Sequence, residues 1–455
     1  MMVTNGKMSV LGAVALAGAC VFAESAEKLS FEYALNRTNG LYAVGEQAEV
    51  SILVKDRNGA KPKTGKLTVE IQRMIPGQLV GKPQEYDLAK TNPIVLEPFT
   101  CETRDSVRVC VRGEGSDGHY NWINPKSCFA FGLGFGLDGI RPATPKPADF
   151  AAFWQAAVRK AEETIPLDVK TELRPEESKG NYNFHSISFA GPGRRVYGYF
   201  SVPKDASAAK RYPARVEIPG AGWGGWSNER QGSDREIRLF LYVYPFQPVN
   251  AKWKDQTAVY TNHVAELRQK YGFFDSVNPQ YAGMAVSREE SYFYPVLVTD
   301  VRAVKWLAGL DYVDAARISY DGHSQGGGLG LALVGLCDGL FHRVRISCPA
   351  LCDLMGYKVG RPTGWPDFHT NYPEKDRLTL ERNMPYFDAA NFASLIRCPV
   401  RVAVGMVDSA CMPTSVYAAF NAIPSSDKMI VNGGLEWGHG VWCEDWNRWD
   451  EWLTK

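Results

Sequence analysis

One short segment constrains the fold of this 455-residue chain more than any other. Residues 322–326 read Gly-His-Ser-Gln-Gly, so a serine stands between two glycines. The residues at 316–320 predict a short strand before it, and the apolar residues 328–336 predict a buried helix after it. A serine on a sharp turn between a strand and a helix is typical of a nucleophile elbow, where glycines leave room for the strained backbone. We therefore predict that Ser324 is a nucleophile.

The nucleophile needs a base, because a serine hydroxyl reacts weakly at neutral pH. Three histidines follow Ser324 in the chain: His342, His369 and His439. His439 stands between glycines, after a predicted strand and before the last predicted helix, which is where this type of fold delivers its base. We choose His439, since His342 follows the nucleophile helix too closely and His369 lies in a proline-rich insertion.

The carboxylate that orients the base is predicted to be Asp408. It follows the expected strand at 400–404 through a short turn, and it fits the chain order serine, acid, histidine. Two alternatives stay open. Asp408 could instead cap the helix expected to begin near Thr414, and Glu436 is a competing carboxylate on the same loop as His439.

The glycine-rich segment 219–225 follows an expected strand at 214–218 and predicts one side of an oxyanion hole. The backbone amide of Gln325 should supply one donor, and the backbone amide of Ala221 the other. Tryptophans near these loops either contact the substrate, as walls of an acyl pocket or platforms for a sugar, or are ordinary loop packing. The candidates are Trp223, Trp226 and Trp437.

The chain from residue 141 onward alternates strand and helix patterns, which predicts a mostly parallel sheet with helices on both faces. Together with the serine turn, this pattern indicates an α/β-hydrolase fold for residues 141–455. Further strands are expected at 195–203, 239–244 and 429–431, and helices at 150–161, 294–309 and 441–453.

Residues 24–140 predict a separate all-β domain. Alternating segments at 48–54, 66–71 and 107–111 are separated by turn residues, which is typical of a small β-sandwich. The proline-rich stretch 141–147 reads as a linker to the α/β domain. No residue here points to catalysis, so a packing or spacer role and a carbohydrate-binding role both stay open.

The first 23 residues predict a signal peptide, because Lys7 precedes an apolar run at 8–19 that is too short to span a bilayer comfortably. A buried N-terminal helix is the alternative. We therefore expect a secreted or periplasmic protein, with no membrane span in the mature chain. The net charge of +1 gives no electrostatic reason to bind nucleic acid.

Cysteine usage argues against a structural metal. The chain has ten cysteines, and an odd number remains once Cys20 leaves with the signal peptide. Cys101 and Cys110 flank a polar turn and could pair across a hairpin in an oxidising compartment. Two paired Cys-x-x-Cys motifs of the kind that bind zinc are absent from the sequence, so we expect neither a metal nor another cofactor.

From about residue 141 to the C-terminus the sequence resembles the acetyl xylan esterase and cephalosporin-C deacetylase family, carbohydrate esterase family 7. The matching segments are 147–154, 166–168, 196–203, 291–294, 299–304, 324–328 and 397–413, the fifth with Thr-Asp-Val-Arg-Ala-Val and the sixth with Ser-Gln-Gly-Gly-Gly. The resemblance implies a triad of Ser324, Asp408 and His439, with oxyanion amides at Gln325 and Ala221. It also implies removal of acetyl groups from sugar hydroxyls, xylan or xylo-oligosaccharide among them, without a metal.

Two positions depart from the family pattern. The family usually has Arg-Gly-Gln where residues 244–247 read Tyr-Pro-Phe-Gln, and Glu where Gly440 stands. These departures leave the substrate preference and the oligomeric state open. The alternatives are an esterase for another acyl group such as feruloyl, a peptidase of the same fold, and a polysaccharide-binding protein with a lapsed site.

Overall fold

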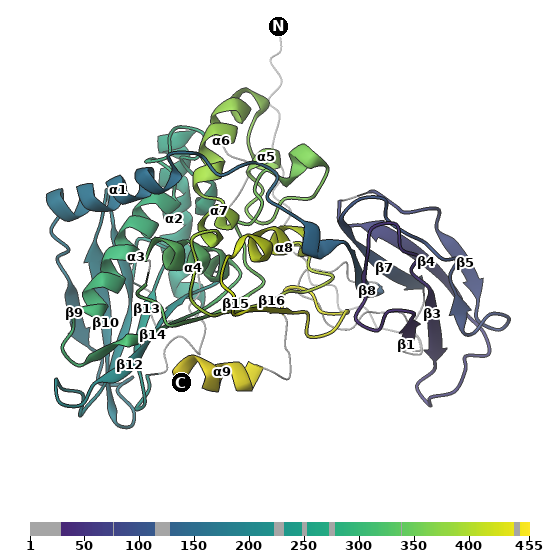
Figure 1. Cartoon of the computed structure of the whole chain (residues 1–455), viewed down its shortest axis with the longest axis horizontal. Coiled ribbons are helices and arrows are strands. Elements are labelled where there is room, and N and C mark those ends of the chain that lie inside the picture. Colours follow the sequence, from purple (N-terminus) through teal and green to yellow (C-terminus); the bar gives the residue numbers. More distant parts are fainter. Residues whose placement is uncertain are drawn as a thin grey trace, which may run out of the picture.

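The computed structural model describes residues 29–75, 77–113, 128–222, 232–247, 253–272, 278–337, 339–440 and 446–455. The expected signal peptide, Trp223 and Trp226 lie outside these residues. The described chain has two parts (Figure 1): a β-rich region (residues 30–135) and an α/β part (residues 150–455). No described helix has both the length and the apolar character needed to cross a membrane.

The α/β part is built on one nine-stranded sheet with the order β17-β16-β15-β14-β12-β13-β11-β10-β9. Strands β12 to β17 run parallel, and β9, β10 and β11 form an antiparallel edge. Their bounds are β9 Lys170–Leu173, β10 Tyr182–Ala190, β11 Arg195–Pro203, β12 Tyr212–Ile218, β13 Ile237–Leu241, β14 Val313–His323, β15 Arg343–Ser347, β16 Val400–Ala403 and β17 Lys428–Val431. The prediction of a mostly parallel α/β-hydrolase sheet is confirmed.

Helices cover both faces of this sheet. They are α1 Phe150–Thr164, α2 Trp253–Tyr271, α3 Phe293–Ala308, α4 Gln325–Leu336, α5 Phe368–Asn371, α6 Arg377–Asn383, α7 Ala389–Ala393, α8 Pro413–Ala422 and α9 Trp446–Thr454. Figure 1 shows α9 below the sheet and α3, α4 and α8 above it. Helix α4 is apolar on every side, and its residues from Gln325 to Gly335 are all buried. It is the helix expected behind the serine turn.

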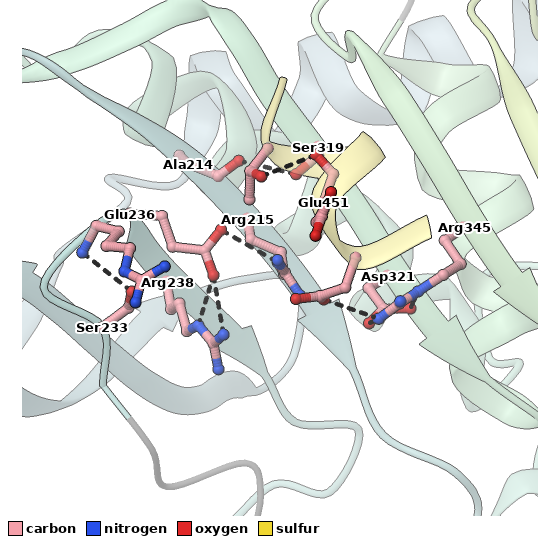
Figure 2. A network of polar contacts seen from close by, with 12 residues as sticks. Ala214, Arg215, Ser233, Glu236, Arg238, Ser319, Asp321, Arg345 and Glu451 are labelled. Carbon is pink, nitrogen blue, oxygen red and sulfur yellow. Dashed lines mark hydrogen bonds and ion pairs between the residues drawn. The ribbon is translucent and has the colours of Figure 1, made fainter. Parts of the chain in front are cut away.

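An ion-pair network attaches α9 to the lower face of the sheet (Figure 2). The Arg215 guanidinium on β12 pairs with Glu236 at 3.2 Å and with Asp450 of α9 at 2.8 Å. Arg345 on β15 pairs with Asp321 and, at 3.4 Å, with the same Asp450. Buried charges of this kind fix position more than they add stability, because desolvation offsets much of the attraction. The network therefore sets where the C-terminal helix lies.

The β-rich region contains two small sheets, with the orders β1-β3-β6 and β2-β8-β7-β4-β5. Their strands are β1 Ser30–Leu35, β2 Leu41–Tyr42, β3 Val50–Lys55, β4 Lys66–Arg73, β5 Gln84–Asp87, β6 Ile94–Val95, β7 Asp105–Gly113 and β8 Phe129–Phe135. Stacked rings join the sheets: Phe31 lies on Phe129 at 4.8 Å between centroids, and Tyr33 on Phe131 at 4.2 Å. The region thus has the two facing sheets that the alternating segments predicted.

The suggested pairing of Cys101 with Cys110 is wrong for this structure, in which both are free thiols. The polar residues after Cys101 lead directly into β7, so the two cysteines follow one another along the chain and do not face each other across a hairpin. Cys110 instead forms a side-chain hydrogen bond with Cys128, which precedes the neighbouring strand β8.

Candidate active site

The serine turn at the end of β14 has an unusual backbone. Ser324 has φ 57° and ψ −120°, a conformation that side-chain-bearing residues rarely adopt. Its amide donates to the Ser347 carbonyl at 2.9 Å, and its carbonyl accepts from the Ala350 amide at 2.9 Å. A Cβ on Gly326 would lie 1.8 Å from the Ile218 carbonyl oxygen, so glycine is required there. The close approach of β12 explains the second glycine of the motif.

The structure brings Ser324, Asp408 and His439 together. His439 Nε2 lies 2.8 Å from Ser324 Oγ, and His439 Nδ1 lies 2.8 Å from Asp408 Oδ2. Asp408 is fully buried, and its other oxygen accepts the backbone amides of Ala410 and Cys411. A histidine held in this way can take the proton of a serine hydroxyl, while the carboxylate orients the ring and stabilises its charged form.

The competing residues lie elsewhere. Asp408 does not cap α8, whose N-cap is Met412. Glu436 accepts a hydrogen bond from the Tyr33 hydroxyl at 2.6 Å. His342 comes just before β15, and the His369 ring stacks on Tyr357 at 3.8 Å between centroids. Of the candidate acids and bases, Asp408 and His439 are therefore the pair that the described chain places beside Ser324.

The candidate acid and base lie on two loops that touch along their backbones: the acid loop (residues 404–412) and the base loop (residues 432–440). The Val407 amide donates to the Trp437 carbonyl at 3.1 Å. A Cβ on Gly405 would lie 1.9 Å from the Gly438 carbonyl oxygen. Because the loops interlock so closely, a shift of one loop would displace the other.

A chain of buried hydrogen bonds holds the expected oxyanion loop. The Tyr244 hydroxyl donates to the Ala221 carbonyl at 2.9 Å. The Gln280 amide donates to Tyr244 at 3.0 Å and to the Gln325 side chain at 2.8 Å. Gln325 in turn donates to the Gly220 carbonyl at 3.3 Å. The two backbone segments expected to supply the oxyanion donors are thereby tied together.

Tyr244 and Gln280 were not predicted as functional residues. The one signal at Tyr244 is that it stands where the family has a different residue. Gln280 has no distinguishing motif around it. Burial raises the pKa of Tyr244 well above its usual value, so its hydroxyl remains a hydrogen-bond donor. Both residues support the loop through contacts that only the folded chain creates.

Buried thiols surround the serine. Burial, followed by the nearby Asp408 carboxylate, raises the pKa of Cys411 well above its usual value, and its side chain hydrogen-bonds Ser324. Cys348, Asp408 and His439 also place potential metal-ligand atoms within 4.8 Å of one another. Since Asp408 and His439 already share a hydrogen bond, this group fits an oriented histidine better than a metal site.

The expected substrate contacts are only partly described. Trp437 lies half-buried on the base loop, two residues before His439. A cavity of about 540 Å³ opens between α1, α2 and the turn after β10, with Arg194, His263 and Tyr292 among its lining residues. None of the three residues of the triad lines this cavity, so it is not the space in front of Ser324.

Comparison with known proteins shows the family of this chain. The acetyl xylan esterase (AXE1) family matches residues 135–434. The acetyl esterase Axe7A of Xylanibacter ruminicola is 27% identical over 406 residues, which cover 87% of this chain and 84% of the relative.

Two solved structures share the fold. The acetyl xylan esterase from Paenibacillus sp. R4 has a TM-score of 0.58 and 22% identity, and the match covers 70% of this chain and 97% of that one. Acetyl xylan esterase 1 from Thermoanaerobacterium sp. JW/SL YS485 has a TM-score of 0.54 and 18% identity, with 70% and 96% covered. At these identities the likeness establishes the fold.

Proposed function

Because this chain belongs to the acetyl xylan esterase family and is thus a carboxylic ester hydrolase, we propose that it is a secreted serine esterase that removes acetyl groups from acetylated xylan or xylo-oligosaccharides. The observation that carries the mechanism is the pair of 2.8 Å contacts that His439 makes with Ser324 and Asp408. The family match and the name of the acetyl esterase relative support the choice of acyl group.

The reaction begins with proton transfer from the Ser324 hydroxyl to His439 Nε2 as Oγ attacks the acetyl carbonyl carbon. The oxygen that becomes negative is stabilised by the backbone amides of Gln325 and Ala221, and loss of one such donor typically costs about 100-fold or more in rate. The bond to the sugar oxygen then breaks. The sugar alcohol leaves with the proton from His439, and an acetylated Ser324 remains.

Water completes the cycle. His439 takes a proton from the water molecule as it attacks the acetyl carbonyl, and Ser324 recovers its proton as acetate leaves. The three tryptophans near the loops, Trp223, Trp226 and Trp437, are the proposed contacts for the sugar. No cofactor takes part in any step of this scheme.

Substrate panels test the acyl group and the carbohydrate separately. Rates on p-nitrophenyl acetate, butyrate and octanoate should fall steeply with chain length, and acetate should be released from acetylated xylo-oligosaccharides. A preference for long acyl chains or feruloyl esters would contradict the deacetylase assignment. Cleavage of peptide substrates in place of esters would favour a peptidase of the same fold.

Export can be tested apart from catalysis. When the full chain is expressed in a Gram-negative host, we expect periplasmic protein whose N-terminus is Glu24. A cytoplasmic product that retains residues 1–23 would contradict export without affecting the esterase proposal.

A further inference from the structure

The β-rich region touches both loops that carry the proposed acid and base. On β8 the large side chains point into the β-rich region, and the small residues Ala130, Gly132 and Gly134 alternate with them on the opposite face. The Gly132 amide donates to the Leu435 carbonyl of the base loop at 2.8 Å. A Cβ on Gly132 would lie 2.1 Å from the Met406 carbonyl oxygen of the acid loop.

Strand β8 therefore supports both loops: its small face contacts the acid loop, and the Gly132 amide at its edge binds the base loop. Ala130 packs in one buried cluster with Val407, the residue before Asp408. Leu435 is 5% exposed, and a Cβ on Gly40 would lie 2.7 Å from its side chain. Backbone approaches this close leave little freedom for the acid loop to move without β8.

A polar contact from β1 reaches further along the base loop. The Tyr33 hydroxyl donates to Glu436 Oε1 at 2.6 Å, across 403 positions of sequence. The Tyr33 ring is stacked on Phe131, with the two ring planes at 6°. Burial, followed by Glu436, raises the pKa of Tyr33, so the phenol remains protonated and donates. Glu436 is three residues before His439, within one short loop.

Helix α9, which follows the base loop in the chain, is attached to the central sheet. It begins at Trp446, a few residues beyond His439, and Asp450 ties it to Arg215 and Arg345 of the sheet. His439 thus lies between two anchors, one on the β-rich region and one on the sheet. The family match covers residues 135–434, so almost the whole β-rich region, the end of the base loop and α9 lie outside the matched residues.

We infer that Tyr33 is a positioning residue for His439 and that the β-rich region completes the active site of the α/β part. This inference rests on the proposed role of His439 as the base. Tyr33 acts through Glu436 and the base loop, and it does not touch the reacting atoms. Without its hydroxyl, the base loop keeps its backbone contact with Gly132 but loses the contact with the β-rich region that lies nearest to His439 along the chain, so the imidazole spends less time aligned with Ser324.

The first test uses the full-length chain and removes a single oxygen atom. Tyr33→Phe keeps the ring that stacks on Phe131, and we expect kcat on p-nitrophenyl acetate to fall about tenfold with KM nearly unchanged, because small displacements of catalytic groups strongly slow the chemical step. The matched control is Tyr42→Phe, which removes another hydroxyl of the β-rich region whose hydrogen bond, to Asn36 at 2.9 Å, lies away from the base loop. Tyr42→Phe should leave kcat unchanged.

A second comparison separates positioning from general stability. Glu436→Ala should lower kcat at least as far as Tyr33→Phe, and adding Tyr33→Phe to Glu436→Ala should cause no further loss. Glu436→Gln keeps an oxygen that can accept from Tyr33, so it should recover most of the activity that Glu436→Ala loses. Melting temperatures of Tyr33→Phe and Tyr42→Phe should agree within about 2 °C, since each loses one tyrosine hydrogen bond.

Each outcome decides the inference. It is overturned if Tyr33→Phe has wild-type kcat, if Tyr42→Phe loses as much activity as Tyr33→Phe, or if Glu436→Gln is no better than Glu436→Ala. The proposed function is tested by Ser324→Ala instead. An inactive Ser324→Ala enzyme beside a fully active Tyr33→Phe enzyme would remove the positioning role and leave the serine esterase intact.

Discussion

The proposed nucleophile and its proposed acid–base pair are held in different ways. Ser324 is fixed inside the α/β part, where its amide bonds to the last residue of β15, its carbonyl bonds to the segment after β15, and Gly326 abuts β12. Asp408 and His439 instead lie on loops that follow β16 and β17 and that also contact β8, where the Gly132 amide donates to the Leu435 carbonyl. The proposed nucleophile cannot shift without disturbing the central sheet, whereas the proposed acid–base pair depends in addition on contacts outside that sheet. The following changes probe that contrast.

The largest effect is expected at the nucleophile. Ser324→Ala should reduce kcat by about 10⁴-fold or more, because no acyl-enzyme can form, while the fold stays intact. Hydrolysis of p-nitrophenyl acetate and the melting temperature measure the two quantities separately. Activity within tenfold of wild type would refute the assignment of Ser324. The neutral Cys411 thiol beside it should not substitute as a nucleophile, because burial raises its pKa.

A methyl group can be added at one glycine beside Ser324, Gly326, and at one glycine beside the acid loop, Gly132. In Gly326→Ala the added methyl would lie 1.8 Å from the Ile218 carbonyl oxygen, between α4 and the sheet. We expect a loss of about 4 kcal/mol or more in unfolding free energy, so that little folded enzyme is recovered. In Gly132→Ala the methyl would lie 2.1 Å from the Met406 carbonyl oxygen, and we expect folded protein with a reduced kcat.

Urea unfolding and circular dichroism distinguish these outcomes. Gly309→Ala is the matched control, because its added methyl would have only ordinary contacts, the nearest at 3.5 Å. If Gly132→Ala unfolded the sheet as thoroughly as Gly326→Ala, the two halves of the site would be equally important for the stability of the fold.

Sequence patterns predicted the nucleophile half well, because its signals are local. The serine turn, the strand before it and the apolar helix after it lie within residues 313–336, and short-range periodicity is enough to find them. The order of Asp408 and His439 along the chain, each after a predicted strand, predicted which residues would meet Ser324. Their catalytic roles remain predictions until the substitutions are measured.

The contacts that support the site could not be predicted from the sequence. Tyr33 meets Glu436 across 403 positions, and Gln280 meets Gln325 across 45, so no spacing rule connects them. The run Phe-Ala-Phe-Gly-Leu-Gly-Phe at 129–135 did carry a usable signal. Its alternation of large and small residues indicates a strand with one flat face, against which another part of the chain can pack.

Helix α2 and strand β15 were not predicted from the sequence, for a different reason. α2 has few apolar residues in a clear stripe, so it carries little helical periodicity. β15 has only five residues, Arg343–Ser347, and its two arginines break the apolar run expected of a central parallel strand. Arg345 is accommodated because Asp321 and Asp450 lie beside it, and these neighbours are known only from the tertiary structure.

The unfolding free energy should depend on pH through Asp388, which holds the segment beside Ser324. The segment 348–353 beside Ser324 has positive φ at Cys348, Leu351 and Asp353, and Asp388 holds it by accepting the Asp353 amide at 3.0 Å. Burial, and then the neighbouring Asp353 carboxylate, raises the pKa of Asp388 to about 7. The folded chain therefore keeps a proton that an unfolded chain, with a pKa near 4, releases.

The sign of the effect follows from that difference. The stabilisation from Asp388 is complete below about pH 4 and is lost as the pH rises to about 7, with an upper limit of about 4 kcal/mol. Asp388→Asn cannot ionise, so the unfolding free energy, measured in urea from pH 4 to pH 8, should fall less steeply than in wild type. Parallel curves for the two proteins would rule out this role for Asp388.

The smallest effect is expected at the second anchor of the base loop. The Asp450 side chain is 53% exposed, so Asp450→Asn should cost only about 0.5–1 kcal/mol of stability despite the two arginines that it contacts. Glu451→Gln is the control on the same helix, since its ion pair with Lys455 is exposed on both sides and spans 3.7 Å. We expect kcat to fall less in Asp450→Asn than in Tyr33→Phe, because the Tyr33 contact lies three residues from His439 and Asp450 lies eleven residues away. A larger fall in Asp450→Asn would mean that α9, and not the β-rich region, is the main support of His439.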